Sequence, residues 1–122
     1  MKSKLLALSK NEEFRKLLQQ KKVSNKYVTI FFGYLNNKNE NRLNISFITK
    51  KKIGNAVKRN KIKRRLRNIM NDACKKISIN LKYSYLVIAK PTMLHNEFKL
   101  IKETLFQEFS KIKRWISLHT YW

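Results

Sequence analysis

A block of positive charge between Lys50 and Arg67 constrains this chain more than any other part of its sequence. Ten of these eighteen residues are basic and none is acidic. A run of like charge normally repels itself and stays disordered. Here apolar residues interrupt the block at Ile53, Val57, Ile62 and Leu66 and continue at Ile69, Ala73 and Ile77, with helical steps of four, three, four and four from Ile62 onward. The spacing predicts a helix that buries one face in a core and presents its cations to a polyanion, for which we expect a nucleic acid.

The charge balance of the whole chain also favours a polyanionic partner. Lysine and arginine outnumber the acidic residues by 29 to 7, which gives a formal net charge of +22 in 122 residues. The length and the 43% hydrophobic content suit one domain with a modest core. We expect a single domain over residues 1–122, with a flexible arm at 1–8, a core at 9–113 and a tail at 117–122 that the sequence does not place.

The sequence favours the cytoplasm and no membrane partner. No apolar run approaches the length that spans a bilayer, and the stretch at residues 5–8 is too short for the core of a signal peptide. The lone Cys74 excludes an internal disulfide framework and suits a reducing compartment.

Before the basic block, the pattern predicts one helix and two strands. Ser9 and Glu12 have the spacing of a capping box, which predicts a short helix over residues 10–20. Residues 27–35 are rich in β-branched and aromatic side chains, and residues 42–49 alternate between apolar and polar. We expect these two strands to pair as an antiparallel hairpin.

After Gly54, Asn55 is a candidate N-cap for a helix that reaches about Lys76. The apolar run at 84–90 predicts a strand buried on both faces. Asn96 can cap a last amphipathic helix, whose apolar positions recur every three or four residues at Phe98, Ile101, Leu105, Phe109, Ile112 and Ile116. The sum is an α+β domain of order α-β-β-α-β-α, or α-β-β-β-α-β-α with a further short strand near 48–53. A parallel crossover around the basic helix should be right-handed by the general rule.

The acidic and nucleophilic residues do not form an obvious active site. Hydrolysis of a phosphodiester usually needs clustered carboxylates that hold metal ions, or a general acid–base pair. Asp72 is a lone acid on the basic helix, where pairing with a nearby lysine explains it. His95 and His119 stand apart, and Cys74 has no partner at the spacing of a zinc site. We therefore expect no metal and no cofactor bound by the protein alone.

Aromatic residues in the N-terminal half offer a second element of RNA binding, because unpaired bases stack on them. Most of these aromatics should be core. Phe31 and Phe32 are adjacent on a predicted strand, so one of them points away from the main core. That one could line a groove with Phe14.

The basic block also carries a resemblance to a known family. The run KKIGNAVKRNKIKRRLR at 51–67 resembles the signature of the bacterial ribonuclease P protein component, an Arg-Asn-Arg helix preceded by Lys-Lys-x-Gly-x-Ala-Val. The runs NEEFRKL at 11–17 and YLVIAKP at 85–91, followed by an amphipathic helix, occur in the family's order. The resemblance covers residues 9–113.

The resemblance implies a subunit of the ribonuclease P holoenzyme, the ribonucleoprotein endonuclease that removes the 5′ leader from precursor tRNA. It implies a 1:1 complex with ribonuclease P RNA, which would carry the catalytic site and its Mg²⁺ ions. It further implies helices packed on a small mixed sheet, a ribosomal-protein-like fold, with a left-handed β-α-β crossover in place of the right-handed default.

Carried over by position, the family's motif names two sets of binding residues. The set facing the catalytic RNA is Lys51, Lys52, Asn55, Arg59, Asn60, Lys61, Lys63, Arg64 and Arg67. The set lining a cleft for the single-stranded leader is Phe14, Phe31 or Phe32, and Lys90.

Two positions depart from the family's pattern. Lys61 stands at the third motif position in place of Arg, which keeps the charge and loses the planar fork for bidentate phosphate contact. Leu18 stands where many members carry a second cleft aromatic, which weakens the case for stacking on that side.

Three other functions are compatible with parts of the sequence. A ribosomal or assembly-type RNA-binding protein fits the composition equally well, but it does not explain the run at 51–67. A metal-dependent nuclease acting alone would depend on Asp72 or Glu103. A helix-turn-helix DNA reader would need a partner helix just upstream of the basic one, which the sequence lacks.

Overall fold

A computed structural model describes residues 4–9, 11–35 and 38–119 of the protein. In chain order its elements are β1 (Leu5–Leu6), α1 (Glu12–Leu17), β2 (Lys21–Ser24), β3 (Val28–Tyr34), β4 (Leu43–Ile48), the 3₁₀ turn η1 (Lys51–Ile53), α2 (Ala56–Lys76), β5 (Tyr83–Ala89), the 3₁₀ turn η2 (Pro91–Leu94) and α3 (Phe98–His119). The predicted α+β class is confirmed.

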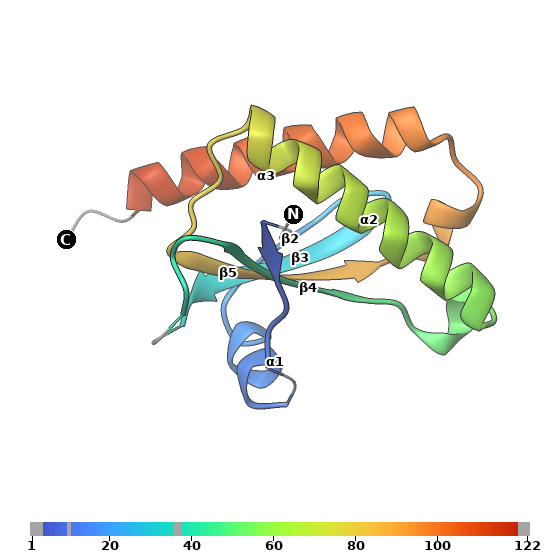
Figure 1. The fold of residues 1–122 in the computed structure, drawn as a ribbon, viewed down its shortest axis with the longest axis horizontal. Helices are drawn as coiled ribbons and strands as arrows, with labels where there is room; N and C mark the ends of the chain where they lie inside the picture. The colour runs from blue at the N-terminus through green and yellow to red at the C-terminus, as the bar shows by residue number, and fades with distance from the viewer. Residues whose placement is uncertain (1–3, 10, 36–37, 120–122) are drawn as a thin grey trace.

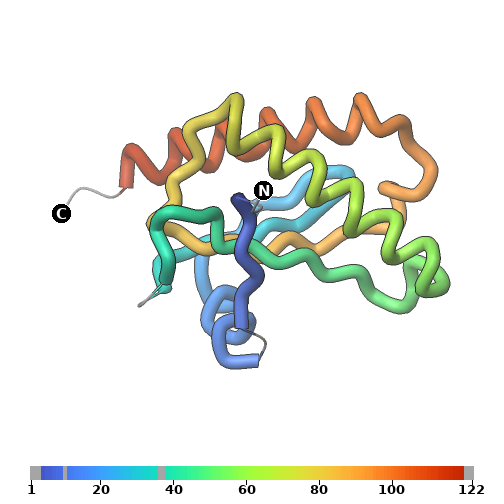
Figure 2. Tube along the Cα trace, in the orientation of Figure 1, coloured from blue at the N-terminus to red at the C-terminus, as the bar shows by residue number. Residues whose placement is uncertain are grey.

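The strands form one mixed sheet in the order β1-β4-β5-β3-β2. β4 is parallel to β1 and β5, whereas β3 is antiparallel to β5 and β2. The helices α2 and α3 lie along one face of this sheet, and the short α1 lies on the other (Figures 1 and 2). β5, predicted to be buried on both faces, is the central strand.

The predicted hairpin between residues 27–35 and 42–49 is wrong, because β5 lies between β3 and β4. Alternation identifies a strand but not its neighbour, and β5, being apolar on both faces, occupies the centre. β3 instead forms a hairpin with β2, an edge strand in a stretch that is too polar to show alternation. The turn between them closes on Asn25, whose side-chain oxygen accepts hydrogen bonds from the backbone N–H groups of Tyr27 and Val28 at 2.8 and 3.0 Å.

Of the arm predicted at residues 1–8, residues 1–3 lie outside the described part, and the remainder includes the short strand β1. Leu5 and Leu6 pair with β4, and Leu8 is buried. The predicted capping box does not form, because α1 begins at Glu12 and its N-cap is Asn11, whose side chain makes no capping hydrogen bond. The backbone N–H of Ser9 instead donates to the carboxylate of Glu13 at 2.6 Å. The further strand suggested near 48–53 is the 3₁₀ turn η1 instead.

The unit from β4 through α2 to β5 is a left-handed crossover, as the resemblance implies. In Figure 1, β1 crosses in front of the sheet, so its neighbour β4 lies nearer the viewer than β5, and α2 lies above both strands. Both strands run from left to right. Seen from α2 with the strands pointing upward, the chain moves from β4 to a strand on its left, against the right-handed default.

The main core lies between the sheet and the two long helices. The predicted stripe on α2 is buried at Ile62, Leu66, Ile69 and Ala73, with Met70 added. Val57, which precedes the predicted stripe, is 77% exposed. Val57 precedes Ile62 by five residues, or about 140° of helix rotation, which puts it off the buried face. On α3 the predicted apolar positions Ile101, Leu105, Phe109, Ile112 and Ile116 are buried, and the helix continues to His119. Residues 120–122 of the unplaced tail lie outside the described part.

Candidate nucleic-acid interface

The start of α2 is fixed by a specific local geometry. Ile53 is buried and anchors η1, which leaves Lys51 and Lys52 exposed. Gly54 has φ of 152°, a conformation that side chains rarely adopt, and an added Cβ would lie 2.8 Å from Cδ of Lys58. Asn55 then caps the helix as predicted, since its side-chain oxygen accepts the backbone N–H of Lys58 at 3.0 Å.

The polar residues of α2 point away from the core in two rows. Asn60, Lys61 and Arg64 are exposed on the side opposite the buried stripe. Arg59, Lys63 and Arg67, spaced by four, form a second row that flanks the stripe. In this second row Arg67 is exposed, and Arg59 and Lys63 are half-buried. The nitrogen Nε of Arg59 is buried without a hydrogen-bond partner and is an unmet donor.

The cations of this segment have no carboxylate partners in the described part of the chain. The ion pairs found there join Lys16 to Glu12, Lys38 to Glu13, and Lys102 to Asp72. None of them involves a cation of residues 50–67. The charge of α2 and η1 therefore remains available to an external polyanion.

A groove runs beside the second row of cations, and we call it the β4 groove. Its volume is about 730 Å³, and it is lined by Leu5, Ala7, Leu8, Asn11, Phe14, Ile45, Ser46, Phe47, Ile48, Thr49, Lys63 and Arg67. The groove forms because β1 pairs only with Leu43 and Asn44, which leaves the rest of β4 without a strand neighbour on that side. The structure thus brings Phe14, expected in the leader cleft, beside Lys63 and Arg67, expected to face the catalytic RNA.

The structure resolves the pair Phe31 and Phe32. Phe31 is half-buried and, like Phe14, packs against the small apolar cluster on the α1 side of the sheet, but it does not line the β4 groove. Phe32 is only 1% exposed and contacts aromatic rings of the main core, with Trp115 edge-on at 5.6 Å. Phe32 therefore does not line a groove, because this side of β3 is covered by α2 and α3. Leu18, at the position of the missing aromatic, is 48% exposed.

Lys90 lies away from the β4 groove. Its ammonium donates to the hydroxyl of Ser24 at 2.8 Å and to the carbonyl of Asn25 at 2.5 Å. These bonds fasten the end of β5 to the turn between β2 and β3. In this position Lys90 stabilises the sheet.

Sequence reasoning missed the groove residues supplied by β4 and the N-terminal segment. Thr49 and Ser46 line the groove with polar atoms, and Ser46 accepts the backbone N–H of Leu8 at 2.9 Å. The side-chain oxygen of Thr49 is buried without a partner. No signal in the sequence marks them, because their role depends on where β1 leaves the edge of β4.

Four of the acidic side chains make structural contacts: Glu12, Glu13, Asp72 and Glu108. Burial by itself raises the pKa of Glu13, but hydrogen bonds from the Lys38 ammonium and the Ser9 N–H outweigh it and lower the pKa overall. The Lys102 ammonium lowers the pKa of Asp72. Among the described residues, no three His, Cys, Asp or Glu side chains gather as they would around a metal ion. In the same residues, no helix has the length and apolarity needed to cross a membrane.

Comparisons with known proteins agree with this geometry. A family model described as "Ribonuclease P" matches residues 2–113. The ribonuclease P protein component of Carboxydothermus hydrogenoformans is 33% identical over 109 residues, which cover 88% of this chain and 90% of that protein. The corresponding protein of Mesoplasma florum is 35% identical over 98 residues, with coverage of 80% and 86%.

Solved structures share the fold. A mutant of the Staphylococcus aureus RNase P protein superposes with a TM-score of 0.73 at 25% identity, covering 88% of this chain and 87% of that one. The RNase P protein from Thermotoga maritima gives the same TM-score at 22% identity, with coverage of 87% and 96%.

Proposed function

Because this chain belongs to the family of bacterial ribonuclease P protein components, which act in the 5′ processing of tRNA, we propose that it binds two RNA elements on adjacent surfaces. The exposed face of α2 with η1 would contact the ribonuclease P RNA. The β4 groove would hold the single-stranded 5′ leader of precursor tRNA. The observation that carries the proposal is the convergence of Phe14, Lys63 and Arg67 on one groove at the border of the α2 surface.

The α2 surface suits a folded RNA with a dense phosphate backbone. The residues exposed there have no carboxylate partners in the described part of the chain; they are Lys51, Lys52, Asn55, Asn60, Lys61 and Arg64. Each cation that neutralises a phosphate releases a counter-ion, so affinity should fall steeply with salt, by about 0.7 to 0.9 log units per contact and per log unit of salt. The rigid cap at Asn55 and the anchor at Ile53 hold these cations in a fixed array, which lowers the entropic cost of binding.

The β4 groove suits a single strand. Its lining includes two cations of α2, Lys63 and Arg67, and the aromatic ring of Phe14 from α1. Single-stranded RNA is bound by this combination, because phosphates follow the cations while bases stack on the rings. Such contacts tolerate changes of sequence, so the proposal predicts that the presence of a leader matters more than its composition.

We assign the breaking of the phosphodiester bond to the RNA subunit and its Mg²⁺ ions, which would activate water and stabilise the leaving oxygen. Family membership supports this assignment. So do the contacts of the acidic residues, since Asp72 pairs with Lys102, Glu13 with Lys38, and Glu108 accepts the side-chain amide of Asn25 at 3.1 Å. The protein's part is then to raise the affinity for substrate and to lower the repulsion between RNA phosphates.

The test is reconstitution with a ribonuclease P RNA and measurement of cleavage and of binding to precursor and mature tRNA. We expect the wild-type protein to stimulate cleavage and to favour precursor over mature tRNA. The double variant Lys63→Gln with Arg67→Gln should lose that preference while mature tRNA binds as before. The double variant Lys111→Gln with Lys113→Gln removes the same charge from exposed positions on α3 and should keep it.

Two results would contradict the proposal. Equal binding of precursor and mature tRNA by the wild-type holoenzyme would contradict the assignment of the leader to the β4 groove. Tight binding of RNA with no effect on cleavage would favour a ribosomal or assembly-type RNA-binding role instead.

A further inference from the structure

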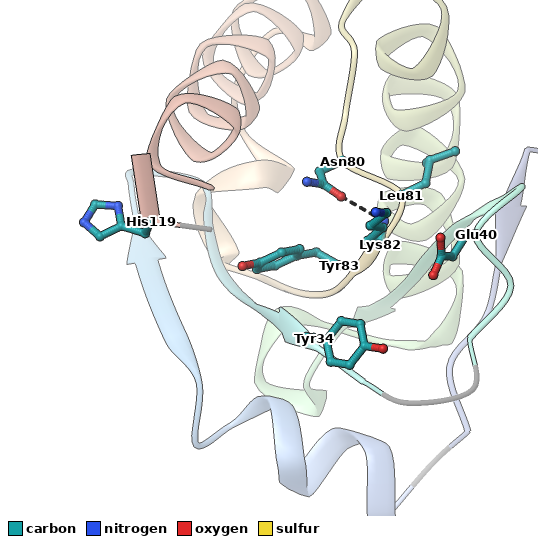
Figure 3. Close-up of a pocket in the computed structure, with 7 residues that line it drawn as sticks. All are labelled: Tyr34, Glu40, Asn80, Leu81, Lys82, Tyr83 and His119. Carbon is teal, nitrogen blue, oxygen red and sulfur yellow. Dashed lines mark hydrogen bonds between the residues drawn. The ribbon is translucent and has the colours of Figure 1, made fainter. Parts of the chain in front are cut away.

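A second pocket lies at the opposite end of the sheet from the exposed end of β4. It has a volume of about 910 Å³, which is in the range of small-molecule sites, and we call it the tyrosine pocket. Figure 3 shows its lining residues, which come from the end of β3, the start of β5, the loops before β4 and β5, and the end of α3. The residues that matter here are Tyr34, Glu40, Asn80, Lys82, Tyr83 and His119.

Two tyrosines are paired at this site by the register of the sheet. Tyr34 and Tyr83 are directly opposite each other on the antiparallel strands β3 and β5, so their side chains leave the sheet on the same face. Tyr34 is 57% exposed and belongs to neither apolar cluster. Tyr83 is half-buried and is backed by Phe32, with ring centroids 6.3 Å apart. The pair offers one free ring and one ring that is held in place from behind.

The end of α3 adds further aromatic surface. The imidazole of His119 stacks on Trp115 at 4.2 Å with an interplanar angle of 12°. Trp115 in turn lies under the ammonium of Lys21, 5.2 Å from the ring centroid. A continuous row of rings therefore runs from the core at Phe32 through Trp115 to the rim of the pocket.

The charges of the pocket indicate what it can bind. Lys82 is exposed at the wall, and Glu40 faces the same space. A ligand made only of phosphate would find far more charge along α2, and Glu40 would repel it here. The pocket instead combines stacking surfaces, one ammonium and the amide nitrogen of Asn80, whose side-chain oxygen already accepts the backbone N–H of Lys82 at 2.9 Å (Figure 3). This combination matches an aromatic base linked to a single phosphate.

We infer that the tyrosine pocket binds one unpaired nucleotide of an RNA strand, with its base against Tyr34 and Tyr83 and its phosphate near Lys82. This inference rests on the proposed function, since it takes RNA as the partner, but it concerns a site separate from the β4 groove. Tyr83 lies at the start of β5, whereas the groove follows β4 and the residue after it, from Ile45 to Thr49, and the linings of the two sites share no residue.

The first experiment substitutes Tyr34 in the reconstituted holoenzyme. Tyr34→Leu removes the ring and Tyr34→Phe keeps it, and because Tyr34 is exposed, neither change should alter the melting temperature. Stacking of one base predicts that Tyr34→Leu weakens RNA binding about fivefold or more, and that Tyr34→Phe restores it. Leu100→Ala, at an exposed apolar residue near the start of α3, is the matched control and should bind as wild type.

Measuring the ribonuclease P RNA and precursor tRNA separately identifies the source of the nucleotide, because only the strand that supplies it should bind more weakly. Wild-type affinity of Tyr34→Leu for both RNAs would overturn the inference. So would a Tyr34→Phe variant as weak as Tyr34→Leu, since the contact would then not be stacking. If the β4 groove variant is impaired while Tyr34→Leu is not, the proposed function stands and this inference falls. If neither is impaired, both fall.

A second measurement needs no variant. Titration of the full-length protein with a short oligouridylate, followed by amide chemical shifts, should perturb Tyr34, Lys82 and Tyr83 in addition to residues of the β4 groove. Shifts confined to the groove would overturn the inference.

Discussion

The most direct quantitative test of the α2 surface is the salt dependence of binding to ribonuclease P RNA. Lys61 and Arg64 are suited to it, because both are exposed on the side of α2 opposite the core, and neither lines the β4 groove. Replacing both with Gln removes two cations and keeps residues of similar helix propensity. The free protein should therefore stay folded, and less self-repulsion should slightly favour it.

The expected magnitude follows from counter-ion release. Two lost phosphate contacts reduce the slope of log affinity against log salt by about 1.4 if the RNA is single-stranded and about 1.8 if it is a duplex. Salt that rises fourfold, from about 50 to about 200 mM, lowers the affinity of both proteins. The factor by which it lowers the wild-type affinity should be roughly 7 to 12 times the factor for the variant. Filter binding or fluorescence anisotropy at four or more salt concentrations gives both slopes.

The control is again Lys111→Gln with Lys113→Gln on α3. Either double variant lowers the formal net charge from +22 to +20, so long-range attraction changes equally in both. Only the α2 variant should change its slope by more than about one unit. If the two variants give the same slope, α2 does not contact phosphates through Lys61 and Arg64, and the surface assigned to the RNA subunit is wrong.

Three further predictions concern the free protein. Leu66→Ala should lower the free energy of unfolding, measured in urea, by about 2–5 kcal/mol because Leu66 is fully buried. Val57→Ala, at an exposed position, should be neutral or raise it by up to about 0.5 kcal/mol. Equal losses would contradict the assignment of the buried stripe. Gly54→Ala should cost about 1–3 kcal/mol in the same assay, because it forces a side chain into a positive-φ conformation against Lys58, and a neutral result would mean that the turn before α2 relaxes freely. The pKa of Glu13 is lowered in the folded state, so its ionised carboxylate stabilises the fold above the unfolded pKa of 4.5, and this stabilisation is lost as pH falls through the folded pKa. Glu13→Gln should therefore make the melting temperature less dependent on pH in this acid range. An unchanged pH dependence would refute the role of this carboxylate.

The features that sequence reasoning predicted well are those set by local interactions. The cap at Asn55, the length of α2 and its buried positions after Ile62 follow from residues within one or two helical turns of each other. Val57 lies five residues before Ile62, outside the pattern of threes and fours, and it is exposed. The buried positions of α3 were predicted for the same local reason.

The sheet could not be predicted to the same degree, because strand order depends on contacts between distant segments. The apolar run of β5 indicated a central strand, but nothing in β3 or β4 shows that β5 inserts between them. The edge strands gave even less signal. β2 is mostly exposed and polar, and β1 contributes only two residues to the sheet.

Only part of the candidate site could be predicted from the sequence. Lys63 and Arg67 belong to a helix whose phase the sequence determines, so their projection from the flank of the buried stripe was accessible from the sequence. Phe14 reaches the same groove only because β1 leaves β4 after Asn44 and carries the chain across to α1. The choice of Phe31 over Phe32 has the same origin, since it depends on which face of β3 the long helices cover. A short edge strand without a sequence signal therefore decides whether the cations of α2 border a groove or a flat surface. For this reason, a change that strengthens or extends the pairing of β1 should affect leader binding more than binding of the RNA subunit.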